Sequence, residues 1–262
     1  MPTPHRERQA AESFGVDAAR YDRTRPSYPA ALIERIVAGL PGRSVLDVGI
    51  GTGILARQLR AVGCDVLGVE PDPRMAAFAR ESGFDVEVAR LEDWEPAGRL
   101  FDGVVSGQAW HWVDPVAGAA AAASALRPGG RLALLWNAGQ PSSTVADGFL
   151  DVYERLLPGS PMASVRGMSA AQGYAGLRDR AEEGIRASGA FAGAERWSAE
   201  WSQVCTRDEW LDQLPTQGLL TRLPAPQLAE LTAAIGGVID AAGGSFPMHF
   251  TTLTTTAVRR AA

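Results

Sequence analysis

Two kinds of apolar pattern alternate between residues 44 and 137. The first consists of short, mostly apolar runs at 44–49, 65–72, 85–91, 101–110 and 131–137. They are typical of parallel strands buried on both faces. The second has apolar residues three or four positions apart and predicts helices at 54–63, 73–83 and 115–126. The sequence RPGG at 127–130 predicts a turn. This alternation predicts βαβ crossovers and an α/β fold on a parallel sheet.

The chain before this region predicts two helices. Residues 13–43 contain a break at Pro26 and Pro29, and the apolar side chains after the break share one side of a helix. These side chains are Leu32, Ile33, Ile36, Val37 and Leu40. We expect this segment to form an N-terminal helical cap.

The chain after residue 137 has a weaker pattern. Residues 140–190 are rich in Gly, Ser and Pro with weak helical periodicity, so we expect an insertion over the sheet, a lid, at 138–193. Residues 194–262 predict strands and helices at 194–205, 207–214, 225–242 and 248–258. Because no repeat or linker divides the sequence, we expect a single domain over 1–262.

Charge and cysteine content restrict the kinds of partner. The net charge of −5 argues against a nucleic-acid or anionic-membrane surface. The two cysteines, Cys64 and Cys205, form no CxxC motif and predict no structural metal site. No apolar run approaches the ~18–20 residues that span a bilayer, and no apolar leader follows Met1. We therefore expect a cytoplasmic protein with a small-molecule partner, of undetermined oligomeric state.

Three glycines follow the first predicted strand, in VLDVGIGTG at 45–53. Gly49, Gly51 and Gly53 allow the backbone to approach a bound nucleotide or to make a tight turn into a helix. In open parallel sheets, ligands bind beyond the carboxyl ends of the strands, where this loop lies. Ile54 breaks the GxGxxG spacing and disfavours a dinucleotide.

Glu70 ends the second predicted strand, 17 residues after Gly53. A carboxylate in this position accepts hydrogen bonds from both hydroxyls of a ribose. Alone it would be interpreted as a solvated residue at a strand end. Together with the glycine loop it predicts a ribose-containing ligand.

Five segments, VLDVGIGTG, GVEPD, LEDW, FDGVVSGQAWHW and LRPGGRLALL, resemble in order and spacing the motifs of class I S-adenosylmethionine (SAM) dependent methyltransferases. The resemblance covers residues 13–137. YDRTRPSYP and QAWHW are similar to a small-molecule subgroup that includes trans-aconitate methyltransferase-like proteins, and MHFTTLTTTAVRR resembles its last strand. Ile50 departs from the Cys, Pro or Ala more common in the family.

The resemblance implies a Rossmann-like fold, with a mixed sheet of seven strands whose last strand is antiparallel. The SAM-binding core would occupy 44–137, and 194–262 would complete the sheet. It also implies contacts with SAM. Asp47 would anchor the loop and the cofactor's amino group, Glu70 the ribose, and the cap would close over the cofactor. The remaining implied cofactor-binding residues are Tyr21, Tyr28, Gly49, Gly51, Gly53, Leu91, Glu92, Asp93 and Gly107.

Methyl transfer requires alignment of the acceptor and, for a protonated acceptor only, a base. His111 is the candidate base, but we favour the interpretation that it and its flanking tryptophans form part of the pocket wall. Trp110, Trp112 and Trp136 predict an aromatic substrate pocket around it. QAWHWVDP stands where nucleic-acid amine methyltransferases carry D/N/S-P-P-Y/F/W, so we do not expect a nucleic-acid substrate. The resemblance to the small-molecule subgroup implies O-methylation of a small carboxylate or hydroxyl compound. The alternatives are a non-catalytic SAM-binding protein and an NAD-dependent oxidoreductase.

Overall fold

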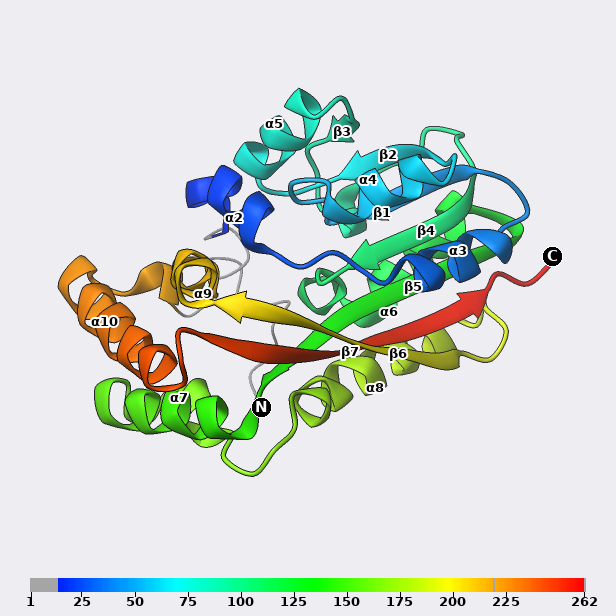
Figure 1. The fold of residues 1–262 in the computed structure, drawn as a ribbon. Helices are drawn as coiled ribbons and strands as arrows, with labels where there is room; N and C mark the ends of the chain where they lie inside the picture. The colour runs from blue at the N-terminus through cyan, green and yellow to red at the C-terminus, as the bar shows by residue number, and fades with distance from the viewer. Residues whose placement is uncertain (1–13, 219, 262) are drawn as a thin grey trace.

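A seven-stranded sheet with helices on both faces forms the centre of the molecule (Figure 1). The computed structural model describes residues 14–218 and 220–261. The strand order is β3-β2-β1-β4-β5-β7-β6, and only β7 runs against the others. The strands are β1 (Ser44–Val48), β2 (Asp65–Val69), β3 (Asp85–Glu87), β4 (Phe101–Gly107), β5 (Leu126–Pro141), β6 (Glu195–Thr206) and β7 (Ser245–Val258). The α/β fold and the antiparallel last strand are confirmed.

The parallel strands bury both faces, because alternate side chains point to opposite sides of a sheet. Leu46 and Val104 pack in a core with α6 (Pro115–Ala125) and α8 (Ala170–Ser188). Val45 and Val105 pack in a second core, beneath the helices on the other face. Those helices are α3 (Ala30–Ala38), α4 (Ile54–Ala61) and α5 (Pro73–Glu81).

A third hydrophobic core lies at one end of the molecule, where α7 (Ser143–Leu156), α9 (Arg207–Gln213) and α10 (Ala225–Ala241) gather (Figure 1). Phe149 of α7 stacks on Trp210 of α9, with ring centroids 5.6 Å apart. Phe246 and Met248 of β7 complete this core. The residues expected to form a lid are therefore divided: α7 belongs to the third core, while α8 covers the sheet beside α6.

The N-terminal segment has the predicted break between two helices. Helix α2 (Ala18–Thr24) follows a short 3-10 turn at Phe14–Asp17, and α3 begins after Pro29. The chain between α2 and α3 is extended, because the residue before a proline is disfavoured in helical conformation.

The predicted turn at 127–130 is an irregularity inside β5. β5 begins at Leu126, and its register against β4 shifts between Phe101 and Gly103. Gly129 has a φ of +79°, which supplies the bend. At the other end β5 continues beyond the predicted residue 137, because it pairs with β7 as far as Pro141.

None of the helices within residues 14–218 and 220–261 is both long and apolar enough to cross a bilayer.

Candidate functional site

A cavity of about 520 Å³ lies at the carboxyl ends of the parallel strands. Val48, Glu70 and Gly107 line it where β1, β2 and β4 end. Phe14 and Tyr21 of the N-terminal segment also line it. A concave site of this size at this edge of the sheet is typical of small-molecule binding.

The glycine loop connects β1 to α4 through three left-handed residues. Gly49, Gly51 and Gly53 have φ angles of +68°, +58° and +92°. A Cβ on Gly49 would also stand 2.4 Å from the Cβ of Ala109, so only glycine fits there. Gly49 and Gly51 line the cavity. Gly53 does not line it; it is the N-cap of α4 and therefore shapes the turn.

Glu70 is held by the loop that it faces. Its Oε2 accepts a hydrogen bond from the Gly51 amide at 2.9 Å, and its Oε1 accepts one from the Asp72 amide at 3.0 Å. Burial raises the pKa of Glu70 to about 7, although these two hydrogen bonds oppose the shift. Each carboxylate oxygen retains a free lone pair. The side chain can therefore accept further hydrogen bonds from a diol in the cavity.

Asp47 is a buried carboxyl group without a partner. It is 1% exposed, and within residues 14–218 and 220–261 neither of its oxygens has a hydrogen-bond partner. Burial, together with the charge of Glu70, raises its pKa to about 8. A buried carboxylate is stabilised by a proton or a nearby cation. This end of the cavity therefore favours a cationic ligand.

The segment expected to contact an adenine edge is only partly at the cavity. Leu91 and Glu92 line it, whereas Asp93 is exposed and does not. The Oε1 atom of Glu92 already accepts hydrogen bonds from the Asp114 amide at 2.8 Å and from Arg90 at 3.0 Å. Arg90 also lines the cavity, so a ligand meets an ion pair here rather than a free carboxylate.

The two cap tyrosines both line the cavity. The Gln58 side chain accepts a hydrogen bond from the Tyr28 amide at 2.9 Å and donates one to the Tyr28 carbonyl at 2.7 Å. A Cβ on Gly107 would stand 2.4 Å from the Tyr28 hydroxyl, so glycine at this position leaves room for it. Tyr21 packs edge-on against Phe14, with ring centroids 5.8 Å apart.

Ion pairs fasten the cap to the rest of the molecule. Asp22 pairs with Arg57 of α4 at 2.6 Å. Asp212 of α9 pairs with Arg20 at 3.2 Å and with Arg23 at 2.8 Å. Opening the cavity on this side therefore requires separation of charged groups that join α2 to two other helices.

The predicted aromatic pocket needs a correction. Trp112 and His111 line the cavity, but Trp110 and Trp136 do not. Trp110 is 2% exposed and Trp136 is fully buried, and both pack in the core beneath α6 and α8. Trp136 lies inside β5 and not at its end, because the strand continues to Pro141. Trp110 begins a 3-10 turn in which successive side chains diverge, so only its neighbours reach the cavity.

His111 is a partly buried imidazole in the cavity wall. Its Nδ1 atom has no hydrogen-bond partner in the described part of the chain. Burial lowers its pKa to about 4, so the ring is neutral near pH 7.

Several lining residues were not found from the sequence. They belong to the insertion and the C-terminal part: Tyr174, Trp210, Gln213, Gln217, Met248 and Phe250. Met248 and Phe250 lie in the segment that resembles the last strand, while the other four belong to no motif. That all six face one cavity is visible only in the fold. Arg25 also lines the cavity and was overlooked, although it lies in the segment YDRTRPSYP, whose tyrosines were identified.

Known proteins are similar to this chain in sequence and in fold. A family model described as a methyltransferase domain matches residues 21–157. An uncharacterized methyltransferase of Mycobacterium tuberculosis is 41% identical over 133 residues, 50% of this chain and 54% of that protein. A trans-aconitate 2-methyltransferase of Mycolicibacterium gilvum is 39% identical over 93 residues, 35% of each chain. The solved structure of a candidate type II methyltransferase from Anaeromyxobacter dehalogenans has a TM-score of 0.64 at 23% identity, and the match covers 91% of this chain and 99% of that one.

The extent of these matches determines what they establish. The chain spans about half the length of the curated relatives it matches first. The structural likeness, at 23% identity, supports the fold. The family model covers slightly more than half of the 262 residues, including the glycine loop, Glu70 and His111. The chain therefore belongs to the methyltransferase domain family, as the resemblance of its motifs indicated.

Proposed function

We propose that this protein is a SAM-dependent methyltransferase that methylates an oxygen atom of a small molecule, either a carboxylate or a hydroxyl. The observation that carries the proposal is the buried carboxyl group of Asp47 beside the glycine loop, which has no hydrogen-bond partner among the residues that the structure describes. SAM contains an ammonium group and a sulfonium, so it supplies the positive charge that this carboxylate needs. Glu70 offers two acceptor oxygens for a ribose diol, and the cavity has a suitable size.

The side chains around the cavity can support this reaction by positioning and by exclusion of water. When bound, SAM supplies an activated methyl group on a cationic sulfonium. Tyr21 and Tyr28 close the cavity from the cap, and Trp112 provides an apolar wall. Holding two reactants in line can lower a barrier by roughly 7–11 kcal/mol. A carboxylate acceptor has no proton to lose, so it needs no base.

His111 fits the same mechanism as a neutral side chain of the pocket wall. With a pKa of about 4 it carries no charge near pH 7, and it can accept a proton only from a hydroxyl acceptor held against it. A carboxylate acceptor agrees with the relative from Mycolicibacterium gilvum, whose name identifies trans-aconitate as its substrate. We favour carboxylate O-methylation for this reason.

The surroundings of the cavity support a small acceptor. Its wall combines aromatic and amide side chains from different elements, among them Trp210, Phe250 and Gln217. The net charge of −5 is unfavourable for nucleic acid. The free cysteines Cys64 and Cys205 are consistent with activity in the cytoplasm.

Titration calorimetry with S-adenosylhomocysteine (SAH), SAM and NAD tests the cofactor. We expect micromolar binding of SAH and SAM, and we expect Glu70→Ala to weaken both by about 1–3 kcal/mol, because the ribose loses a charged acceptor. Binding of NAD in place of SAM, or unchanged affinity in Glu70→Ala, would contradict the proposal. Transfer of labelled methyl from SAM to a panel of small acids, phenols and amines separates an enzyme from a non-catalytic SAM-binding protein.

A further inference from the structure

A second, smaller cavity adjoins His111. Its volume of about 20 Å³ is enough for one water molecule. His111 and Val113 line both this cavity and the large one, so they separate the two. The other residues that line the small cavity are Trp110, Pro115, Leu177, Arg180 and Ala181. It is therefore enclosed by the segment that follows β4 and by helix α8.

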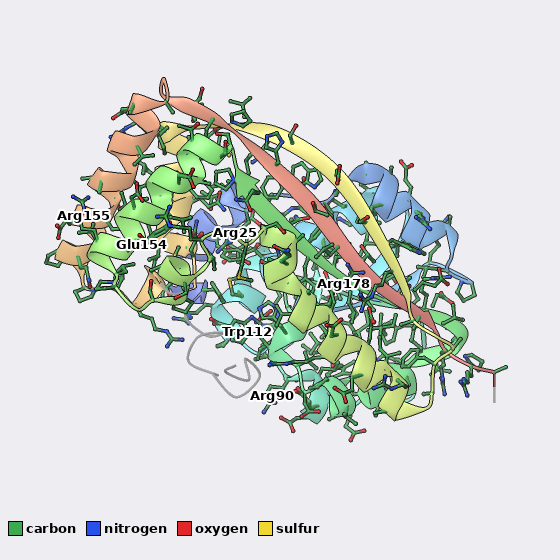
Figure 2. The ribbon with its side chains drawn as sticks, turned by 90° about the horizontal axis from the view of Figure 1, so that it is seen from below. Arg25, Arg90, Trp112, Glu154, Arg155 and Arg178 are labelled. Atoms are coloured by element: carbon green, nitrogen blue, oxygen red, sulfur yellow. The ribbon has the colours of Figure 1, made fainter. Side chains whose placement is uncertain are left out.

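Close packing surrounds the small cavity. The 3-10 turn Trp110–Trp112 contacts α8, and Figure 2 shows Trp112 beside this helix. At the start of α6, the carbonyl oxygen of Pro115 lies so near α8 that a Cβ on Gly184 would overlap it. A water molecule in the small cavity would therefore be an internal water, enclosed by protein on the side of both helices.

Two polar atoms of the residues around the small cavity need a partner. The Nε1 atom of Trp110 and the Nδ1 atom of His111 are both buried, and neither has a hydrogen-bond partner in the part of the chain that the structure describes. Buried polar groups are commonly satisfied by ordered water. An indole N–H only donates, and an imidazole nitrogen without a proton only accepts. One water molecule can therefore satisfy both atoms, by accepting from Trp110 and donating to His111.

The small cavity also determines which nitrogen of His111 carries the proton. Trp110 and Arg180 have only hydrogen-bond donors, and the four other neighbours of His111 around the cavity have apolar side chains. Nδ1 is thus the one side-chain atom there that can accept a hydrogen bond, provided that it carries no proton. The neutral ring then has its proton on Nε2, the nitrogen that a ligand in the large cavity can reach.

We propose that one water molecule in the small cavity joins Trp110 to His111 and fixes the Nε2–H form of the ring, which donates a hydrogen bond to the carboxylate of the methyl acceptor. The inference rests on the proposed function, because it takes the acceptor to be a small acid. The Nε2–H group can hold one carboxylate oxygen and leave the other to receive the methyl group. It cannot take the proton of a hydroxyl acceptor, so His111 selects carboxylates.

NMR of protein labelled with ¹⁵N-histidine tests the position of the proton without any methyl acceptor. Protonated and unprotonated ring nitrogens differ clearly in chemical shift, and couplings to the ring C–H protons distinguish Nδ1 from Nε2. The chain has two other histidines, His5 and His249, so His111→Gln assigns the signals by subtraction. We expect the Nε2–H form of His111 at pH 7, both in the ligand-free protein and with SAH.

Trp110→Phe tests the water molecule. It removes the indole N–H, so the water can then accept from His111 as easily as donate to it, and we expect a measurable share of the Nδ1–H form. Trp136→Phe is the matched control. The Nε1 atom of Trp136 is also buried without a partner among the described residues, in the same core, but Trp136 lines neither cavity. This variant should keep the signals of His111 unchanged.

Two substitutions of His111 test the donor in methyl transfer to the panel of small acids. Glutamine can place its amide N–H near the position of Nε2, whereas asparagine can place it only near Nδ1. We expect kcat/KM to fall about 10- to 100-fold in His111→Asn, mainly through KM, and only a few-fold in His111→Gln.

The outcomes separate the inference from the proposed function. An Nδ1–H form in the wild type, or unchanged signals of His111 in Trp110→Phe, would show that no such water fixes the ring. Equal losses in His111→Asn and His111→Gln would show that Nε2–H does not hold the acceptor. If the wild type methylates phenols of the panel and none of its acids, carboxylate methylation itself fails, whatever form of His111 the NMR spectra show.

Discussion

Replacement of Asp47 by asparagine should stabilise the ligand-free protein. In the unfolded chain this carboxyl group ionises near its ordinary pKa of 3.8, whereas in the fold its pKa is about 8. Between these values the folded state binds a proton that the unfolded state has lost, so stability falls as the pH rises, by about 1.4 kcal/mol per pH unit. At pH 7 the accumulated penalty is about 4 kcal/mol, and above pH 8 it no longer grows.

Asparagine has the same shape and does not ionise, so Asp47→Asn removes this penalty. Its amide would itself be buried without partners, which costs about 1–3 kcal/mol. We therefore expect a net gain of about 1–3 kcal/mol at pH 7, shrinking towards zero or reversing near pH 4. The same change should weaken SAM binding, because the ligand's ammonium loses its carboxylate.

Urea denaturation of the ligand-free protein at several pH values between 4.5 and 8.5 measures this effect. Asp102→Asn is the matched control. Asp102 is also buried, but it accepts hydrogen bonds from the Ser44 amide at 2.9 Å and from Arg127 at 3.0 Å, so this variant should be destabilised. If Asp47→Asn loses stability as Asp102→Asn does, or if its gain does not depend on pH, Asp47 is not an unpartnered carboxyl group and the reasoning is refuted.

Three further predictions concern other parts of the site. Because the pKa of His111 is about 4, the rate of methyl transfer to a carboxylate should show no imidazole titration between pH 6 and 8. His111→Phe should mainly raise KM, whereas a drop in kcat of about 100- to 10,000-fold would make His111 the base instead. Gly49→Ala should destabilise the fold by about 1–3 kcal/mol in urea denaturation, and by more than Gly129→Ala, whose added Cβ meets open space; equal losses would contradict the close contact at Gly49. Asp212→Asn should speed SAH dissociation several-fold in stopped-flow measurements and make the dissociation rate less dependent on salt concentration. An unchanged dissociation rate would show that the ion pairs of the cap do not limit release of SAH.

The parts of the site that depend on local sequence were predictable. The glycine loop and Glu70 lie within a single βαβ unit, and their roles follow from the order of strand, turn and helix. The positive φ angles at Gly49 and Gly51 agree with the prediction that the backbone there needs glycine. The break at Pro26 and Pro29 is also a local property, because proline has no backbone N–H for a helical hydrogen bond.

The acceptor side of the cavity depends on pairing between distant segments, which a local pattern does not contain. Trp136 was expected at the end of its strand, but Pro141 of β5 pairs with Met248 of β7, and this places the ring in the middle of the sheet. Trp210 has the pattern of an ordinary core residue, and it does pack on Phe149. Trp210 also faces the cavity, because the third hydrophobic core to which it belongs lies beside the cavity.

The third hydrophobic core gives the two sides of the cavity different freedom to change during evolution. The cofactor side belongs to the parallel sheet. There the Gly49 amide donates to the carbonyl of Val69 in β2, and Glu70 accepts from the amide of Gly51, so a substitution disturbs the main fold. The opposite wall, with Trp210, Met248 and Phe250, is the surface of a core that packs largely on itself. Most of that core follows residue 157, where the family match ends. New acceptors can therefore be accommodated by repacking one end of the molecule, and combined substitutions in α7, α9 and α10 are a route to altered selectivity.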